Sequence, residues 1–421
     1  MKIILLNTFE LNGGAAIACN RLAIALRKNG VEAKVLVRDK QTDNDHTISV
    51  NKSILTKTLN KLRFREERLL IWIRNRFSKN NLFAVSIANT GIDISKEKEI
   101  KEADIIHIHW INQGFLSLQD LKKLTALEKP IVWTMHDQWP YTGICHYTSG
   151  CDRFAEVCSC CPKLKNPGKN DLSYKIFKRK MKLYQSNTFT FAGCSRWIAN
   201  EAKKSGLCRK AKIVSIPNPI DTAIYDKQDK MEARKLFDLP LSEKLILFGA
   251  CKVTDKRKGF DYMKKACDLL YKKNILEKKD VAIVVFGGKT NEIESLLPYN
   301  IHPVGYVNDV KTMANLYSAV DLFLMPSLED NLPNTIMEAM SCGVPCVGFD
   351  TGGIPEMIDH KKNGYIAGYK NAEDLVEGIR WILKEADYHE ISINARRKVI
   401  EEYGENKVAK QYIDLYNRLL H

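Results

Sequence analysis

The stretch DLFLMPSLEDNLPNTIMEAMSCGVPCVGFDTGGIPE, residues Asp321 to Glu356, decides the fold of the carboxyl-terminal half of the chain. An apolar run at Leu322 to Met325 predicts a buried parallel strand, and a second run at Cys346 to Phe349 predicts another. The segment between them carries helix start and stop signals. Strand, helix, strand is a βαβ unit, so we expect its ligands at the carboxyl ends of the strands.

The predicted helix has Asn331 as its N-cap, Pro333 in its first turn and Gly343 at its end. Asp330 precedes this helix and Glu338 lies in its second turn. Both carboxylates are therefore expected to face one exposed crevice, where the helix N–H groups would point toward a phosphate. In the alternative interpretation, Asp330 only caps the helix and Glu338 is solvated surface.

The acidic-x7-acidic spacing in DNLPNTIME, followed by AMSCGVPCV and GGIPE, resembles the donor-binding signature of the retaining family 4 glycosyltransferases. That signature is normally Glu-x7-Glu, whereas this chain has Asp first. The resemblance implies that Asp330 contacts the donor sugar and that Glu338 holds the nucleotide ribose. It also places further donor-binding residues at the start of the helix: Asn331, Leu332, Pro333, Asn334 and Thr335.

Length and composition indicate the general class of the protein. A chain of 421 residues is long enough for two α/β domains, and 45% hydrophobic residues are typical of a soluble globular protein. The start MKIILLN is too short for a signal peptide, and the twelve cysteines then suggest reduced thiols in a cytoplasm. The net charge of +15 requires an anionic partner, but no nucleic-acid recognition motif is present, so no nucleic acid is expected.

Residues 51–80 are strongly basic, with nine Lys or Arg against two Glu, a net charge of +7. Leucines and aromatic residues are interleaved with these charges. Such a basic amphipathic helix can lie on an anionic membrane surface, and a second basic run at residues 175–182 favours this interpretation. Alternatively, the helix packs its apolar side on the sheet and its basic residues are solvated.

A glycine loop and three histidines are the amino-terminal candidates. Gly13 and Gly14 join the first predicted strand to a helix, and the resemblance implies that they lie against the donor's sugar-phosphate. The alternation in DIIHIHW places His107 and His109 on one face of a strand. His136 directly follows another strand, and the resemblance implies that it contacts the donor sugar near the reacting centre.

The segment CHYTSGCDRFAEVCSCC carries five closely spaced cysteines, and four of them, all but Cys160, follow the pattern C-x5-C-x6-C-x2-C. In a reducing compartment this spacing favours a structural zinc site over disulfides or an iron–sulfur cluster. The predicted ligands are Cys145, Cys151, Cys158 and Cys161. Some family 4 enzymes carry a similar insert after a His-Asp pair.

The loop after the predicted strand at 245–249 contains Lys252 and Lys258, which could stabilise a departing diphosphate. The resemblance assigns both to this role. It also implies that the nucleotide base is received near Tyr306, in PVGY. With these cations and the helix N-terminus in place, no catalytic metal is expected.

The resemblance implies an α/β fold of GT-B architecture, with two doubly wound Rossmann-like domains facing a central cleft. We expect an acceptor-side domain at 1–219 with the cysteine-rich insert at 145–161, a nucleotide-sugar domain at 220–400, and a final helix at 401–421 that crosses back.

The implied activity is that of a retaining, hexosyltransferase-type glycosyltransferase (EC 2.4). It would move sugar from a UDP- or GDP-sugar to a glycan or polyprenyl-linked acceptor, in polysaccharide or cell envelope biosynthesis. The alternatives are a sugar-nucleotide epimerase and a non-catalytic sugar-nucleotide-binding protein. The expected location is the cytoplasm, with peripheral attachment to the inner face of the plasma membrane as an extension.

Overall fold

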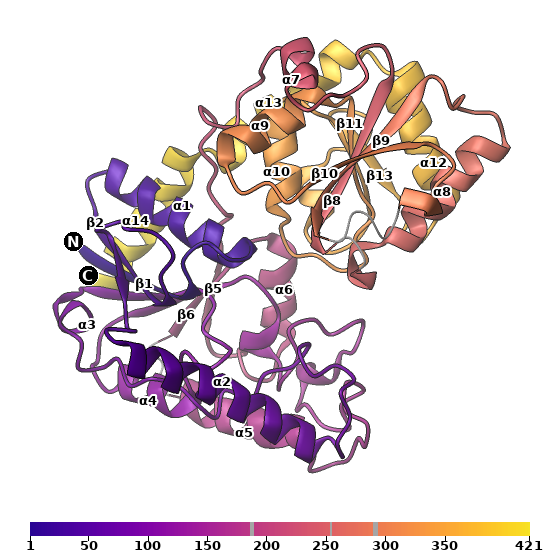
Figure 1. Ribbon diagram of the computed structural model, residues 1–421. Helices are drawn as coiled ribbons and strands as arrows, with labels where there is room; N and C mark the ends of the chain where they lie inside the picture. Colours follow the sequence, from indigo (N-terminus) through magenta and orange to yellow (C-terminus); the bar gives the residue numbers. More distant parts are fainter. Residues whose placement is uncertain (186–188, 253–254, 289–293) are drawn as a thin grey trace. The chain divides into compact units, whose positions relative to one another are not determined.

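The computed structural model describes residues 1–185, 189–252, 255–288 and 294–421, with the side chains of residues 250–252 and 294 excepted. The chain divides into two compact units (Figure 1). The first unit is Met1–Asn218 with Val408–His421, and the second is Pro219–Lys407. Each unit is built on one parallel sheet, which confirms the predicted α/β class.

The first unit contains a seven-stranded sheet in the order β3-β2-β1-β4-β5-β6-β7, with every neighbouring pair parallel. Its carboxyl ends all lie at one edge, because parallel strands share a direction. The strands are β1 (Lys2–Phe9), β2 (Glu32–Asp39), β3 (Thr47–Ser49), β4 (Ile105–Ile108), β5 (Ile131–Met135), β6 (Phe189–Gly193) and β7 (Lys212–Ser215).

Two layers of helices cover this sheet. One core joins the strands to α1 and to the carboxyl-terminal helix α14, through side chains such as Leu26 and Tyr412. The other core includes α4, α5 and α6. The helices of the unit are α1 (Gly14–Lys28), α2 (Ile54–Arg74), α3 (Lys98–Glu102), α4 (Leu118–Thr125), α5 (Leu172–Tyr184), α6 (Arg196–Lys204) and most of α14 (Glu405–Leu420).

The second unit contains a six-stranded parallel sheet in the order β10-β9-β8-β11-β12-β13. The predicted runs at 322–325 and 346–349 are strands β11 and β12, and they pair directly with each other. The strands are β8 (Lys244–Lys252), β9 (Val281–Gly288), β10 (Asn300–Gly305), β11 (Leu322–Met325), β12 (Cys346–Phe349) and β13 (Gly364–Ala367).

Helices α8 and α12 pack against strands of this sheet in one apolar core. The βαβ unit predicted from the sequence is β11, α10 and β12, and this unit brings the loop before α10 and the loop after β12 to the carboxyl edge. The helices are α7 (Lys230–Leu236), α8 (Phe260–Lys272), α9 (Val310–Ala319), α10 (Asn334–Ser341), α11 (Ile354–Met357), α12 (Ala372–Arg380) and α13 (Tyr388–Tyr403).

Helix α2 buries polar side chains together with Ile71 on one side and leaves an apolar stripe in solvent on the other. Glu67 is fully buried, where its carboxylate accepts backbone N–H groups of Ile87 and Ala88 at 2.8 and 2.9 Å. The Arg68 guanidinium pairs with Glu67 at 2.9 Å and donates to the carbonyl of Val85 at 2.8 Å. These bonds anchor the helix to the segment that follows it.

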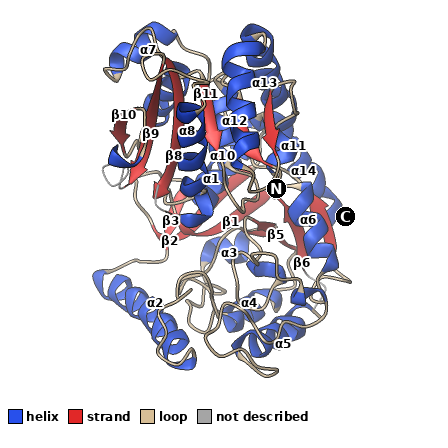
Figure 2. Ribbon diagram, turned by 90° about the vertical axis from the view of Figure 1, so that its right-hand side faces the viewer, coloured by secondary structure: helices blue, strands red, loops and turns tan. Residues whose placement is uncertain are grey.

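The opposite side of α2 is an apolar stripe, formed by Leu55, Leu59, Leu62, Leu69 and Ile73, which are 45 to 77% exposed. Their spacing repeats every three or four residues, so they share one helix face. Figure 2 shows α2 at the margin of its unit. The alternative, in which the helix packs its apolar side on the sheet, holds for Ile71 and Leu70, which pack in the core of the unit, but not for this stripe.

Among the described residues, none of the helices has the combination of length and apolar character needed to cross a membrane.

Candidate functional site

Three loops meet at the carboxyl edge of the six-stranded sheet. The loop after β8 carries a 3-10 turn, Lys256–Lys258, whose Arg257 carbonyl accepts the backbone N–H of Leu328 at 2.8 Å. Leu328 and Asp330 follow β11. The loop after β12 joins them, because the Gly353 N–H donates to the carbonyl of Asp330 at 3.2 Å.

Asp330 is a buried carboxylate held by two cations. The Lys258 ammonium donates to its Oδ2 at 2.6 Å, and the Arg257 guanidinium lies 3.4 Å from the same oxygen. Burial alone would raise the pKa of Asp330, but the charges of Lys258 and Arg257 hold this pKa below its ordinary value. Asp330 is therefore ionised at neutral pH, and the three side chains form one charged cluster.

Two glycines are required by this packing. Gly259 has a φ of +74°, and a Cβ there would lie 1.8 Å from the carbonyl oxygen of Pro326. Gly352 has a φ of +60°, and its Cβ would lie 1.7 Å from the carbonyl oxygen of Asp330. Both positions need the left-handed conformation and the close backbone approach that glycine allows. The Lys-Gly step and the Gly-Gly loop thus fix the backbone around the carboxylate.

The N-cap of helix α10 lies two residues after the predicted one. The prediction that Asn331 is the N-cap is wrong: the helix starts at Asn334, and Pro333 is the N-cap with no side-chain cap bond. Asn331 and Leu332 are buried in a bend, because tertiary packing of Leu332 extends the loop. Asp330 does not cap the helix either. Of the predicted donor-binding residues here, Pro333 is also buried, whereas Asn334 and Thr335 are half-buried.

Glu338 is buried, with 6% of its surface exposed, so the alternative in which it is solvated surface is wrong. The Tyr317 hydroxyl of α9 donates to Glu338 Oε2 at 3.0 Å. Tyr317 was not predicted from the sequence, because it lies twenty-one residues before its partner. The bond fixes the Glu338 carboxylate behind the amino-terminal turn of α10.

Other predicted residues of this unit lie further along the same edge. The backbone of Lys252 ends β8, but its side chain is outside the described part of the structure. Tyr306 directly follows β10 and is exposed. The sequence analysis did not predict Arg257 as a site residue, although it is adjacent to Lys258. Only the 3-10 turn brings both side chains to one carboxylate.

The glycine loop of the first unit lies at the carboxyl end of β1. Gly13 has a φ of +92° and is the N-cap of α1, which begins at Gly14. No side chain caps this helix start, and a Cβ on Gly13 would meet no atom within 4 Å. The predicted loop is thus present at a helix start. Its role toward a donor remains a prediction.

The three histidines form a cluster at the carboxyl edge of β4 and β5. The rings of His107 and His109 are 4.4 Å apart, which confirms that they share a face. His109 Nδ1 and His136 Nε2 are hydrogen-bonded at 2.8 Å. The remaining nitrogen of His136 lies 3.4 Å from the Cys194 sulfur. A sugar contact through either His136 nitrogen would therefore displace an internal partner.

Burial keeps this cluster uncharged. It lowers the pKa of His107 to about 3 and that of His136 to about 4. It also holds the pKa of His109 well below its ordinary value. The three imidazoles are therefore neutral at physiological pH, and His107 is further fixed by the Tyr416 hydroxyl of α14 at 2.7 Å.

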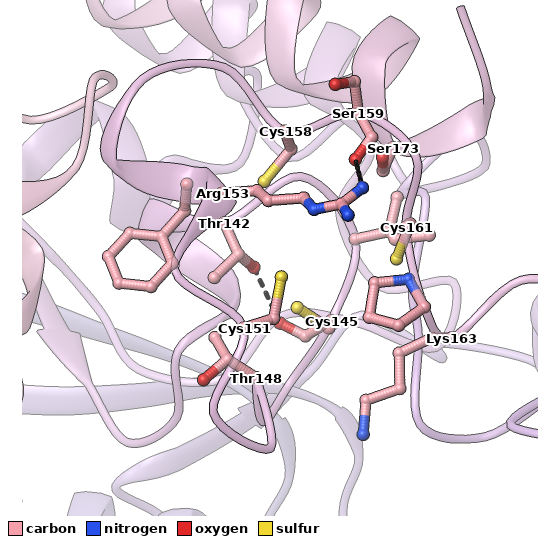
Figure 3. Close-up of a pocket in the computed structure, with 13 residues that line it drawn as sticks. Thr142, Cys145, Thr148, Cys151, Arg153, Cys158, Ser159, Cys161, Lys163 and Ser173 are labelled. Carbon is pink, nitrogen blue, oxygen red and sulfur yellow. Dashed lines mark hydrogen bonds between the residues drawn. The ribbon is translucent and has the colours of Figure 1, made fainter. Parts of the chain in front are cut away.

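The cysteine-rich insert is tied to this edge through Asp137. Its carboxylate accepts the Trp110 indole N–H at 2.9 Å and bonds His146 Nδ1 at 2.7 Å. His146 directly follows Cys145. The four predicted metal ligands line one cavity of the insert (Figure 3). As the side chains stand, however, the described part of the chain holds no group of three or more His, Cys, Asp or Glu side chains that could bind a metal ion.

Two family models match the chain. The model described as Glycosyltransferase Family 4 matches residues 12–224, which is half of the chain. The model described as Glycosyl transferases group 1 matches residues 231–401, and that range contains Lys258, Asp330 and Glu338.

Curated relatives include a synthase and several proteins named as glycosyltransferases. N-acetyl-alpha-D-glucosaminyl L-malate synthase of Bacillus anthracis is 28% identical over 214 residues, which is 49% of this chain and 54% of the relative. The putative colanic acid biosynthesis glycosyl transferase WcaC of Escherichia coli K12 is 23% identical, over 75% of this chain and 76% of the relative. The chain spans only 54 to 60% of the length of the first three curated relatives that it matches.

A solved structure shares the fold. HepE of Anabaena, determined in complex with UDP and glucose, superposes with a TM-score of 0.64 at 16% identity, over 99% of this chain and 100% of that one. This likeness confirms the predicted GT-B fold. With one family model spanning half of its residues, the chain belongs to glycosyltransferase family 4.

Proposed function

We propose that the protein transfers a sugar from a nucleotide-sugar donor to a hydroxyl acceptor, with retention at the anomeric carbon. The observation that carries this proposal is the cluster of Lys258, Arg257 and Asp330 beside the start of α10. A departing diphosphate needs fixed positive charge and N–H donors where its negative charge develops. Two cations, already positioned by a buried carboxylate, can provide that charge.

Each residue of the cluster has a distinct proposed role. Lys258 and Arg257 bind the diphosphate, and Asp330 holds both cations and accepts a hydroxyl of the donor sugar. Glu338, oriented by Tyr317, accepts hydroxyls of the nucleotide ribose. Membership of family 4 supports these roles, as does the relative HepE, which was solved with UDP and glucose. No catalytic metal is required in this proposal.

The proposed transfer needs no covalent intermediate on the protein. The acceptor oxygen bonds to the anomeric carbon on the face that the diphosphate leaves. The bond from this carbon to the phosphate oxygen breaks, and a diphosphate oxygen takes the acceptor proton.

The proposal is tested by incubating the protein with a panel of UDP-, GDP- and ADP-sugars and measuring nucleoside diphosphate release. Release from one nucleotide class, slowed by Lys258→Ala, is the expected result. Conversion of the sugar nucleotide to a stereoisomer without acceptor would instead favour an epimerase. Binding without any turnover, with acceptor extracts included, would favour a non-catalytic binding protein.

For the acceptor, we propose a lipid-linked glycan that is reached by peripheral attachment to an anionic bilayer. Support comes from the apolar stripe of α2 and from the exposed basic residues beside it, Lys57, Lys61 and Arg65. Apolar side chains can enter the headgroup region while the cations bind anionic lipids, at about 1 kcal/mol for each basic residue. A second copy of the chain is disfavoured as the occupant, since it would bring two such basic segments together.

Vesicle sedimentation tests this attachment. The wild-type protein should sediment with phosphatidylglycerol-containing vesicles, less with neutral ones, and less as salt rises. Replacing two stripe residues, Leu62→Glu with Leu69→Glu, should abolish sedimentation. Leu236→Glu is the matched control, because Leu236 is an exposed leucine on α7 in the second unit. Equal sedimentation of both variants with anionic vesicles would refute the attachment.

A further inference from the structure

The cysteine-rich insert lacks the usual means of ordering a chain. Between β5 and α5 its regular structure is limited to two 3-10 turns, Trp139–Tyr141 and Arg153–Ala155. The side chains that flank the cysteines, Trp139, Tyr141, Ile144 and Leu164, are buried in the core of the unit, and the described cysteines are all free thiols. Residues 145–161 themselves bury one large apolar side chain, Phe154, so this stretch needs another source of order.

Four thiols surround one small cavity in the insert. Cys145, Cys151, Cys158 and Cys161 line a space of about 20 Å³, and Figure 3 shows their sulfurs around it. That volume is of the order occupied by a single small atom or ion. Cys160 does not line the cavity, and its φ of +46° turns the chain between Cys158 and Cys161.

The backbone already presents a hydrogen bond to one of these sulfurs. The Gly143 N–H donates to the Cys158 sulfur at 3.2 Å. A Cβ on Gly143 would lie 2.7 Å from the carbonyl oxygen of Ser173 and 3.0 Å from the Cys158 Cβ, so this close approach requires glycine. N–H groups directed at sulfur stabilise a thiolate more than a thiol, because the acceptor then carries the charge.

A buried lysine contacts the peptide group that joins Thr142 to Gly143. Lys180 of α5 belongs to the basic run at 175–182, yet it is fully buried. Its Nζ donates to the carbonyl of Thr142 at 3.1 Å and to that of Trp139, and it lies 3.3 Å from the centre of the Trp139 ring. In the described part of the chain no carboxylate forms an ion pair with Lys180.

The Thr142 carbonyl and the Gly143 N–H belong to one peptide group. A cation on the carbonyl oxygen polarises that peptide and strengthens the N–H as a donor to the Cys158 sulfur. Lys180, the peptide and Cys158 thus form a continuous chain that favours negative charge on sulfur. Lys180 has carbonyl and ring partners but no carboxylate, so negative charge close by would stabilise its charged form, and a set of thiolates would supply that charge.

We propose that Cys145, Cys151, Cys158 and Cys161 hold one zinc ion as thiolates, with Lys180 as the positioning and charge-balancing residue acting through the Thr142–Gly143 peptide. A cysteine side chain has a single rotatable bond, so each sulfur reaches the ion by rotation while the backbone keeps its place. Four thiolates close the tetrahedral shell, so the site is structural. The proposal does not rest on the transferase activity.

The first measurement is the metal content of the full-length protein, expressed with zinc in the medium and purified without chelator. About one zinc per chain is expected, and replacement by Co²⁺ should give the visible and near-ultraviolet bands of tetrahedral thiolate coordination. Cys158→Ser should lose the metal, whereas Cys160→Ser, the matched control, should keep it.

The second measurement isolates Lys180 by competition with a chromophoric chelator. Lys180→Met should weaken zinc affinity about 10–100-fold, as the loss of outer-shell partners does, whereas Lys178→Met, an exposed lysine on the same helix, should leave it unchanged. Should Cys158→Ser fail to fold, the Co²⁺ spectrum still tests the zinc site and the two lysine variants still test the role of Lys180. Absence of zinc from the wild-type protein would overturn the site. Equal zinc affinity in the two lysine variants would overturn the role of Lys180.

Discussion

Both sheets are parallel and present polar side chains at their carboxyl edges, but these side chains are neutral in the first unit and charged in the second. In the first unit, His107, His109 and His136 are neutral because burial lowers the pKa of each. In the second unit, Asp330 is also buried but stays ionised, because the positive charges of Lys258 and Arg257 stabilise its carboxylate. The neutral edge suits uncharged hydroxyls, and the charged edge suits a diphosphate. Burial alone therefore does not set the charge of a site; the partners do.

Removing a cation from the charged edge should have the largest effect. Lys258→Ala should lower turnover by about 10²–10³, because a fixed donor to the developing leaving-group charge is lost. Arg257→Ala should act in the same direction and less strongly, since its distance to Asp330 is the longer one. Lys256→Ala is the matched control, because Lys256 is an exposed lysine in the same turn. Steady-state kinetics checks all three, and equal losses would contradict the comparison.

Glu338→Gln should weaken donor binding about 10–100-fold, because it removes charge-assisted hydrogen bonds to the ribose. Tyr317→Phe should produce a smaller loss, since it leaves the carboxylate in place and removes only the hydroxyl that orients it. Isothermal titration calorimetry with the donor measures both variants. A Tyr317→Phe loss as large as that of Glu338→Gln would show that orientation, and not charge, is the main contribution.

The neutral edge predicts a smaller, pH-dependent effect. A histidine pKa of about 4 in the folded state, against about 6.5 when unfolded, means that the unfolded chain binds more protons between these values. Stability of the first unit should therefore rise as pH increases from about 4 to about 6.5 and be lost on acidification through that window.

Tryptophan fluorescence can follow this unfolding, because five of the six tryptophans belong to the first unit. His136→Asn should flatten the dependence on pH, since one of the buried imidazoles is gone. A melting temperature that is constant between pH 4 and 6.5 would contradict the neutral cluster.

The sequence analysis predicted the parts of this comparison that depend on local pattern. β11 and β12 have the predicted bounds, because uninterrupted apolar runs between turn residues leave few alternatives. The start of α10 was wrong, since burial of Leu332 outweighs the capping preference of Asn331.

The polar partners of the site could not be predicted, because they come from separate segments. Tyr317 meets Glu338 only after α9 and α10 have packed, and Arg257 reaches Asp330 only through its 3-10 turn. Helix α2 shows the same limit at larger scale. Its interleaved apolar and basic residues predicted an amphipathic helix, but the buried bonds of Glu67 to residues 87 and 88 turn the apolar stripe outward.

The central claim is that the Lys258, Arg257 and Asp330 cluster is a diphosphate site. Calorimetric titration with UDP, GDP and ADP tests it most directly, because the result does not depend on the unknown sugar or acceptor. We expect one of these nucleotides to bind the wild-type protein and the Lys256→Ala control equally, and to bind Lys258→Ala and Arg257→Ala more weakly. If none of the three binds the wild-type protein, or if the cluster variants bind as tightly as the control, the account is contradicted.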